Sequence, residues 1–171
     1  MSNYLVLTII AEDRAGIVEQ VARAISQHGG NWMESSMARL AGKFAGILLV
    51  EVDAAAQQGL QQDLDALASD GIKVTVENSN PHHSDEEAQV SCLEIVANDR
   101  PGIVGEISSL LAKNQVNLIS LETFCESAPM SAGMMFYAHA YTQLPEAMTE
   151  SQLTQLLESL SDDLMVEIVE A

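Results

Sequence analysis

Positive charge is the scarcest property of this sequence. Seven Lys and Arg residues stand against 25 Asp and Glu residues, so the net charge at pH 7 is −18. Nucleic-acid-binding proteins draw most of their affinity from Lys and Arg on phosphates, and anionic membrane surfaces attract basic segments. We therefore expect no direct contact with nucleic acid or with a membrane. The acidity is compatible with solubility alone or with a basic protein partner.

Cysteine and long apolar runs are also in short supply. Cys92 and Cys125 are the two cysteines, which is too few for a secreted disulfide framework, and neither has a second Cys at metal-ligand spacing. No apolar run approaches the roughly 20 residues of a membrane span. The segment Met1-Ser2-Asn3-Tyr4 has no basic region before an apolar run, so we expect no signal peptide. The sequence predicts a cytoplasmic protein with no metal and no cofactor.

What the sequence does contain is an internal repeat. Asp13-Arg14-Ala15-Gly16-Ile17-Val18 reappears as Asp99-Arg100-Pro101-Gly102-Ile103-Val104, at an offset of 86 positions. The same offset takes Asn31 to Asn117, and one extra residue then aligns Gly46 with Gly133. Because such self-similarity is typical of duplicated units, we infer two copies of one module.

Both copies predict the same order of secondary structure. Each opens with a β-rich apolar run, at residues 4–10 and 90–97. An amphipathic helix follows each run, with apolar residues every three or four positions; Gly29-Gly30 ends the first and Asn114-Gln115 the second. Two strands, a second helix and a closing strand complete each copy. Asp53 is a candidate N-cap of that second helix in copy one, and Thr149 begins a capping box in copy two.

The order βαββαβ, present twice, predicts an α+β protein of two ferredoxin-like modules. Each module is expected to be a four-stranded antiparallel sheet with two helices on one face. The expected domains are residues 1–77 and 90–171, and the polar segment 78–89, which contains Pro81, reads as their linker.

The two repeated glycines lie where a strand gives way to a helix. The first amides of a helix lack intrahelical partners and carry the positive end of its dipole, so a carboxylate or phosphate is stabilised there. Gly16 and Gly102 have no Cβ to block a ligand's approach. We expect Asp13 and Asp99 to cap these turns.

An asparagine opens the second strand of each copy, Asn31 in the first and Asn117 in the second. If this strand lies beside the first helix, the Asn could lie near the glycine turn, where its amide could read the amine of an α-amino acid. The alternative is purely structural, because Gly suits tight turns and Asn suits chain reversals. Cys125 and His139 are residue types that can form a catalytic pair, but nothing in the sequence brings the two together.

These features together resemble the ACT-domain family of amino-acid-sensing regulatory modules. The resemblance lies in the Asp-Arg-(Ala/Pro)-Gly-Ile turn, the Asn that opens the second strand, and the βαββαβ order. It covers nearly the whole chain and implies a regulatory protein rather than an enzyme. It also implies the following ligand-binding residues: Asp13, Arg14, Gly16, Ile17 and Asn31, and Asp99, Arg100, Gly102, Ile103 and Asn117.

Within that family the chain looks like the stand-alone tandem ACT proteins that include transcriptional repressors of the glycine cleavage system. That likeness implies an amino acid ligand, with glycine as a candidate, and indirect control of transcription through a DNA-binding activator protein. A ligand-free dimerisation or interaction scaffold is the alternative. The ligand, the number of occupied sites and self-association into homo-oligomers stay open at this point.

Overall fold

The computed structural model describes residues 1–80, 89–130 and 133–170 of the chain. The chain divides into two compact units, Met1–Ser84 and Asp85–Ala171. Strand β4 runs on to Ser79, past the expected end of the first domain at residue 77. The expected linker residues 81–88, with Pro81, lie outside the described residues.

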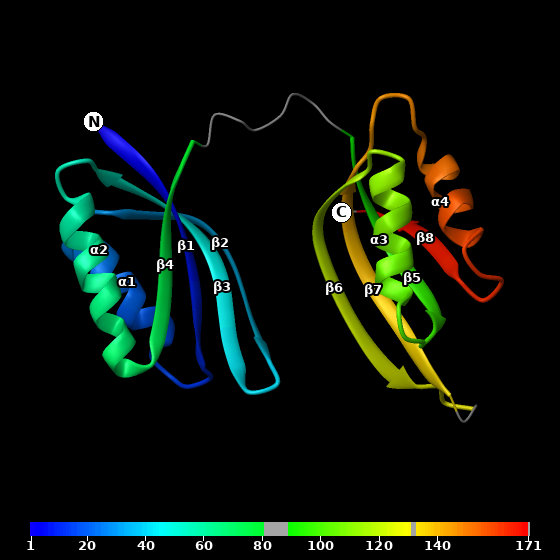
Figure 1. Cartoon of the computed structure of the whole chain (residues 1–171), viewed down its shortest axis with the longest axis horizontal. Coiled ribbons are helices and arrows are strands. Elements are labelled where there is room, and N and C mark those ends of the chain that lie inside the picture. Colours follow the sequence, from blue (N-terminus) through cyan, green and yellow to red (C-terminus); the bar gives the residue numbers. More distant parts are fainter. Residues whose placement is uncertain (81–88, 131–132, 171) are drawn as a thin grey trace. The chain divides into compact units, whose positions relative to one another are not determined.

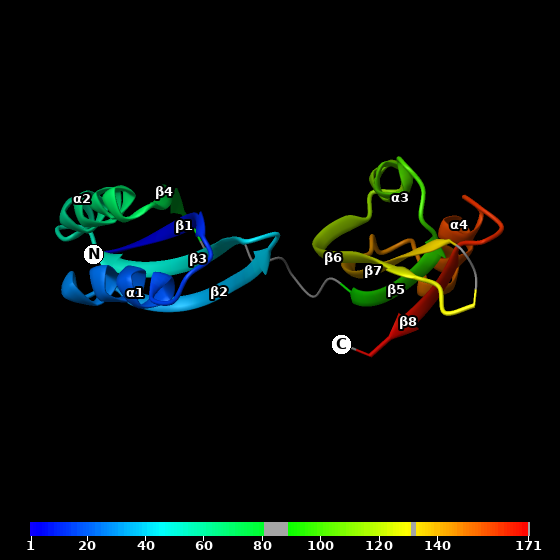
Figure 2. The same ribbon diagram turned by 90° about the horizontal axis from the view of Figure 1, so that it is seen from below.

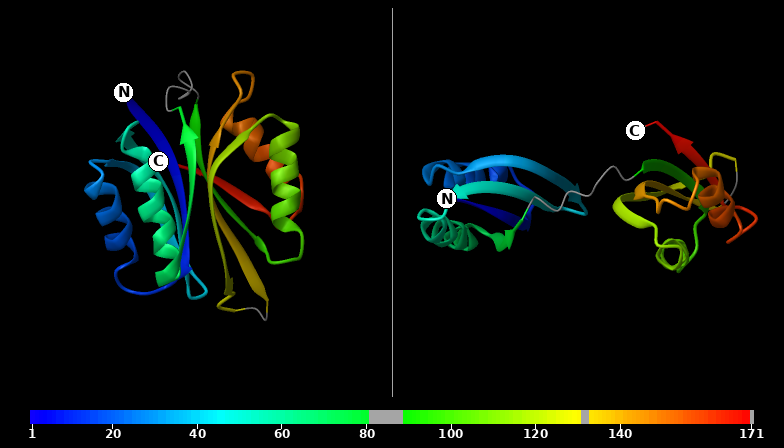
Figure 3. Two further views of the ribbon diagram at one scale, coloured as in Figure 1. Left: turned by 60° about the vertical axis from the view of Figure 1, so that its left-hand side comes forward. Right: turned by 90° about the horizontal axis from the view of Figure 1, so that it is seen from above.

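The first domain has the expected βαββαβ order with one short 3-10 turn added (Figure 1). Its sheet is antiparallel with strand order β2-β3-β1-β4. Both helices cover one face of that sheet (Figure 3, left). Its elements are β1 (Ser2–Glu12), α1 (Ile17–Gln27), β2 (Asn31–Leu40), β3 (Lys43–Asp53), α2 (Gln57–Ala66), η1 (Leu67–Asp70) and β4 (Ile72–Ser79).

The second domain repeats this arrangement, with strand order β6-β7-β5-β8 and helices α3 and α4 on one face of the sheet (Figures 1 and 3). The two ferredoxin-like modules predicted from the sequence are therefore confirmed. The elements are β5 (Val90–Asn98), α3 (Ile103–Lys113), β6 (Asn117–Ser127), β7 (Met134–Gln143), α4 (Glu150–Glu158) and β8 (Met165–Val169).

Each core lies between the sheet and its two helices. Alternate residues of β1, such as Leu5, Leu7 and Ile9, are at most 1% exposed, and they pack with apolar residues of α1 and α2. The second domain buries Leu93, Ile95 and their neighbours in the same way. Because such side chains leave a cavity when truncated, replacing one Leu by Ala costs about 2–5 kcal/mol.

Both first helices end in the same motif. In α1 the amide of Gly29 donates to the carbonyl of Ser26 and that of Gly30 to the carbonyl of Ile25, which is the Schellman pattern. Gly29 holds the left-handed φ of 67° that this motif requires. In α3 the equivalent bonds run from Gln115 to Ala112 and from Val116 to Leu111, and Gln115 takes a φ of 57°.

Of the two N-caps predicted for α2 and α4, the one at α4 is confirmed and the one at α2 is wrong. Thr149 forms the expected capping box with Gln152 at the start of α4. The prediction for Asp53 is wrong, because α2 begins only after Ala56. The Asp53 carboxylate accepts from the amide of Ala55 at 2.9 Å, so it stabilises the turn that precedes the helix.

The alignment of Gly46 with Gly133 is also wrong. In the first sheet Gly46 lies opposite Ile9, whereas the matching position opposite Ile95 is Ala138. Gly133 lies just before β7 begins, at the tip of the β6–β7 hairpin. The β6–β7 connection is longer than the β2–β3 turn, and the paired residues of the strands on either side correspond in the two domains.

Candidate ligand site

The two glycine turns form equivalent open corners between a strand and a helix (Figures 1 and 2). Gly16 (φ 93°) and Gly102 (φ 88°) are the N-cap residues of α1 and α3, and no side chain caps either helix. A Cβ added at either glycine would meet no atom within 4 Å. The corners are therefore unobstructed at the point where a helix N-terminus stabilises an anion.

Asp13 and Asp99 do not cap these helices, contrary to expectation. Each lies three residues before its N-cap glycine, and its backbone amide instead donates across to the neighbouring hairpin, from Asp13 to Gly42 and from Asp99 to Met134, at 2.9 Å in both cases. The Asp13 carboxylate lies 3.4 Å from the guanidinium of Arg39. The aspartates thus fasten the corner to the sheet and leave the first helical amides without a side-chain partner.

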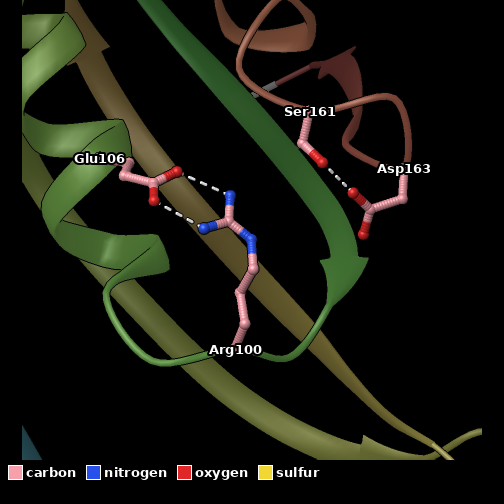
Figure 4. A network of polar contacts seen from close by, with 4 residues as sticks. All are labelled: Arg100, Glu106, Ser161 and Asp163. Atoms are coloured by element: carbon pink, nitrogen blue, oxygen red, sulfur yellow. Dashed lines mark hydrogen bonds and ion pairs between the residues drawn. The ribbon is translucent and has the colours of Figure 1, made fainter.

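The two corner arginines have different partners. Arg14 Nη2 donates to the carbonyl of Asp70 at 2.7 Å, which ties the first corner to the turn before β4. Arg100 instead makes two hydrogen bonds of 2.6 and 2.7 Å with the carboxylate of Glu106 on α3 (Figure 4). The hydrogen bonds from Arg100 lower the pKa of Glu106, and the same contact raises the pKa of Arg100.

A further carboxylate contacts the backbone of the second corner. Asp163 accepts a hydrogen bond from the amide of Asn98 at 2.8 Å. It accepts another from the hydroxyl of Ser161 (Figure 4). Chiefly the Ser161 contact, then the Asn98 amide, lowers the pKa of Asp163. No motif in the sequence indicates this contact, because Asn98 and Asp163 are 65 residues apart. The register places Gly71 at the position equivalent to Asp163, so the first corner has no side-chain acceptor at that position.

The isoleucines that follow the glycines can offer a ligand only their backbone. The side chains of Ile17 and Ile103 are 2% and 4% exposed and belong to the two cores. Their role in the predicted site is therefore reduced to their amides, which lie in the first turn of each helix.

The asparagines do not lie beside the glycine corner of their own domain. Asn31 and Tyr4 both pair with Glu51, so Asn31 lies level with the first residues of β1. Gly16 follows the other end of β1, about 26 Å away at 3.3 Å per strand residue. Asn117 is placed in the same way and donates to Gln143 at 3.3 Å. The conditional expectation of proximity within one domain is wrong.

The side chains of Cys125 and His139 point away from each other. Cys125 pairs with Phe136, which is buried under the helices, while His139 stacks near Phe124 on the opposite face. Burial and the nearby Asp99 raise the pKa of the Cys125 thiol, which favours its unreactive protonated form. Within residues 1–80, 89–130 and 133–170, no cluster of three or more His, Cys, Asp or Glu side chains could hold a metal ion.

No helix in the described part of the chain combines the length and apolar character needed to cross a membrane.

Comparison with known families finds an ACT domain twice, at residues 3–77 and at residues 93–158. No curated protein sequence matches the chain. The crystal structure of an unknown protein from Galdieria sulphuraria is similar over 99% of this chain and 100% of its own, with 25% identity and a TM-score of 0.80. A candidate glycine cleavage system transcriptional repressor matches over 100% of this chain and 99% of its own, with 18% identity and a TM-score of 0.73.

Proposed function

Because this chain belongs to the ACT-domain family, with one module in each half, we propose that it is a regulatory protein that senses an amino acid. We further propose that it acts on transcription indirectly, through a DNA-binding activator protein, and that it is not an enzyme. Glycine is the first ligand to test, since one structure of the same fold is described as a candidate repressor of the glycine cleavage system.

The open glycine corners carry this proposal. Each presents uncapped helical amides at a position that no Cβ obstructs. An amino acid's carboxylate can accept from these amides, and it is also stabilised by the positive end of the helix dipole.

The amine of the ligand needs a second partner, and the asparagine of the same domain is too far away. We therefore restrict the proposed contact at each corner to the ligand's carboxylate.

The charge of the chain favours a protein partner over direct DNA contact. A net charge of −18 repels phosphates and attracts basic protein surfaces. For the ligand to regulate this partner, it must bind the partner-competent and partner-incompetent states with different affinity.

Thermal unfolding with each amino acid tests the sensing proposal. We expect glycine at about 100 times its Kd to stabilise the chain by about 2.7 kcal/mol, because it binds only the folded state. The variant Gly16→Asn/Gly102→Asn should lose this response. Asn tolerates positive φ better than other side chains, so the variant fills the corners while the fold is kept.

Gly29→Asn is the matched control, since Gly29 also has a positive φ and open space but lies at the far end of α1. It should keep the full glycine response. If no amino acid at millimolar concentration shifts the unfolding temperature, the sensing proposal fails and the interaction scaffold stands in its place.

A further inference from the structure

The second domain has one sheet face that neither of its helices covers. Leu93, Ile95 and Ala97 point into the core under α3 and α4, so the residues between them, Glu94 and Val96, point to the opposite face. We call this surface the uncovered face. Directly paired residues of neighbouring strands share a face, so the register orders its side chains into rows that run across the four strands.

One of these rows is acidic. It runs through Glu122 on β6, His139 on β7, Glu94 on β5 and Glu167 on β8. His139 Nδ1 lies 3.4 Å from Glu94 Oε1. Glu94 and Glu167 lie directly opposite each other, an arrangement in which like charges destabilise a sheet.

The adjacent row is apolar and partly aromatic, with Phe124 on β6, Tyr137 on β7, Val96 on β5 and Met165 on β8. The rings of Phe124 and Tyr137 stack with centroids 5.0 Å apart. Phe124 is 41% exposed and Met165 59%. Large apolar side chains that stay exposed beside a row of charges are typical of interaction sites.

The first domain shows that the fold itself requires neither row. Its positions equivalent to the acidic row hold no charged residue; they are Ser36, Ile47, Thr8 and Thr75. Its positions equivalent to the aromatic row hold no aromatic residue; they are Ala38, Ala45, Ile10 and Lys73. The same sheet therefore forms without either feature.

The domain supplies no Lys or Arg of its own to the acidic row. From residue 90 onward, Arg100 and Lys113 are the only ones in the sequence. Arg100 is paired with Glu106 on α3, and Lys113 ends α3 on the covered side of the sheet. The carboxylates of this row are thus available to cations from outside the domain.

We propose that the uncovered face of the second domain binds a basic amphipathic helix of a partner protein. Four strands spaced about 4.8 Å apart make the acidic row about 14 Å long, which matches two to three helical turns. Lys or Arg residues one turn apart would meet the carboxylates, and apolar residues beside them would cover Phe124 and Met165. A second copy of this face carries the same carboxylates and no Lys or Arg to pair with them, so a basic helix is the better match for the acidic row.

The test uses the full chain and a fluorescein-labelled synthetic peptide of about 18 residues, built from Leu and Lys as an amphipathic helix. Fluorescence anisotropy at about 0.15 M salt should show saturable binding. The variant Glu94→Thr/Glu122→Ser/Glu167→Thr, which carries the first domain's residues, should weaken binding roughly tenfold or more. Phe124→Ala/Tyr137→Ala should weaken it by a similar factor.

Two controls separate this surface from general electrostatics. Glu146→Gln/Asp162→Asn/Glu170→Gln removes the same number of charges from other exposed positions of the domain, and it should leave the affinity within about twofold. A peptide of identical composition with scrambled order should bind weakly. The proposal is overturned if the wild-type chain does not bind the peptide, if both triple variants weaken binding equally, or if the aromatic variant binds normally.

This inference rests on the proposed function only in assigning the helix to a regulated partner. The glycine-induced shift in unfolding temperature, measured on the same variants, distinguishes failure of the helix-binding proposal from failure of the sensing proposal. Loss of peptide binding with an intact glycine response supports the surface alone, whereas a chain without any amino acid response can still bind the peptide.

Discussion

Gln115 occupies a backbone position that the first domain fills with glycine. Its φ of 57° is left-handed, as is the 67° of Gly29 at the equivalent helix end. This conformation costs a non-glycine residue about 1–2 kcal/mol. Glycine avoids that cost, although the greater entropy of its backbone in the unfolded chain offsets part of the stabilisation. We expect Gln115→Gly to stabilise the second domain by about 0.5–1 kcal/mol, measured as a higher urea midpoint.

The reverse substitution provides the control. Gly29→Gln places a side chain in the same geometry of the first domain and should lower stability by a similar amount. If both substitutions leave the midpoint unchanged, the backbone conformation does not carry this cost.

Single residues also mark the limit of what the sequence could predict. Gly16 and Gly102 lie between a strand and a helix, as expected, because the sequence pattern on either side of each glycine is local. Asp53 was misplaced because an extra turn, invisible in the polar pattern, separates it from α2. Asp163 was missed because its partner, the amide of Asn98, is 65 residues away in the sequence.

At the scale of elements, the strands and helices were predictable and their relative placement was not. A strand or helix that packs against a core on one of its faces has apolar residues at regular intervals. This periodicity locates β1 and α1 in the first domain and β5 and α3 in the second. It does not say which end of a strand lies near which turn, so the sequence could place Asn31 near Gly16 only on the condition that the second strand lies beside the first helix. Pairing register decides this point, and it also corrects the alignment of Gly46 from Gly133 to Ala138.

The contact of Asp163 with β5 predicts a pH dependence of the second domain. The pKa of Asp163 is lowered in the folded state, so its contribution is present above the ordinary Asp pKa of about 3.9 and is lost as the pH falls through the folded value. Asp163→Asn keeps an oxygen acceptor but no charge. We expect the variant to unfold at a lower temperature than wild type at pH 7, with this gap closing at acidic pH.

Asp162→Asn is the control for that experiment, because the exposed neighbour loses the same charge without the Asn98 contact. Its unfolding temperature should stay parallel to that of wild type across the pH range. A constant gap between wild type and Asp163→Asn down to the lowest pH would contradict the assignment.

At the scale of the whole molecule, 25 acidic residues against seven basic ones give a net charge of −18, which bears on the stability of the fold. Like charges repel one another more strongly in the compact state than in the extended one, so they lower stability. Added salt shortens the screening length from about 30 Å at 0.01 M to about 10 Å at 0.1 M. We expect the unfolding temperature to rise by roughly 4–8 °C over this range, equivalent to about 1 kcal/mol. NaCl and KCl should raise the unfolding temperature equally. The second domain should respond more than the first, because Arg100 and Lys113 are its only Lys and Arg residues. An unfolding temperature that stays constant or falls with salt would show that specific ion pairs outweigh the repulsion.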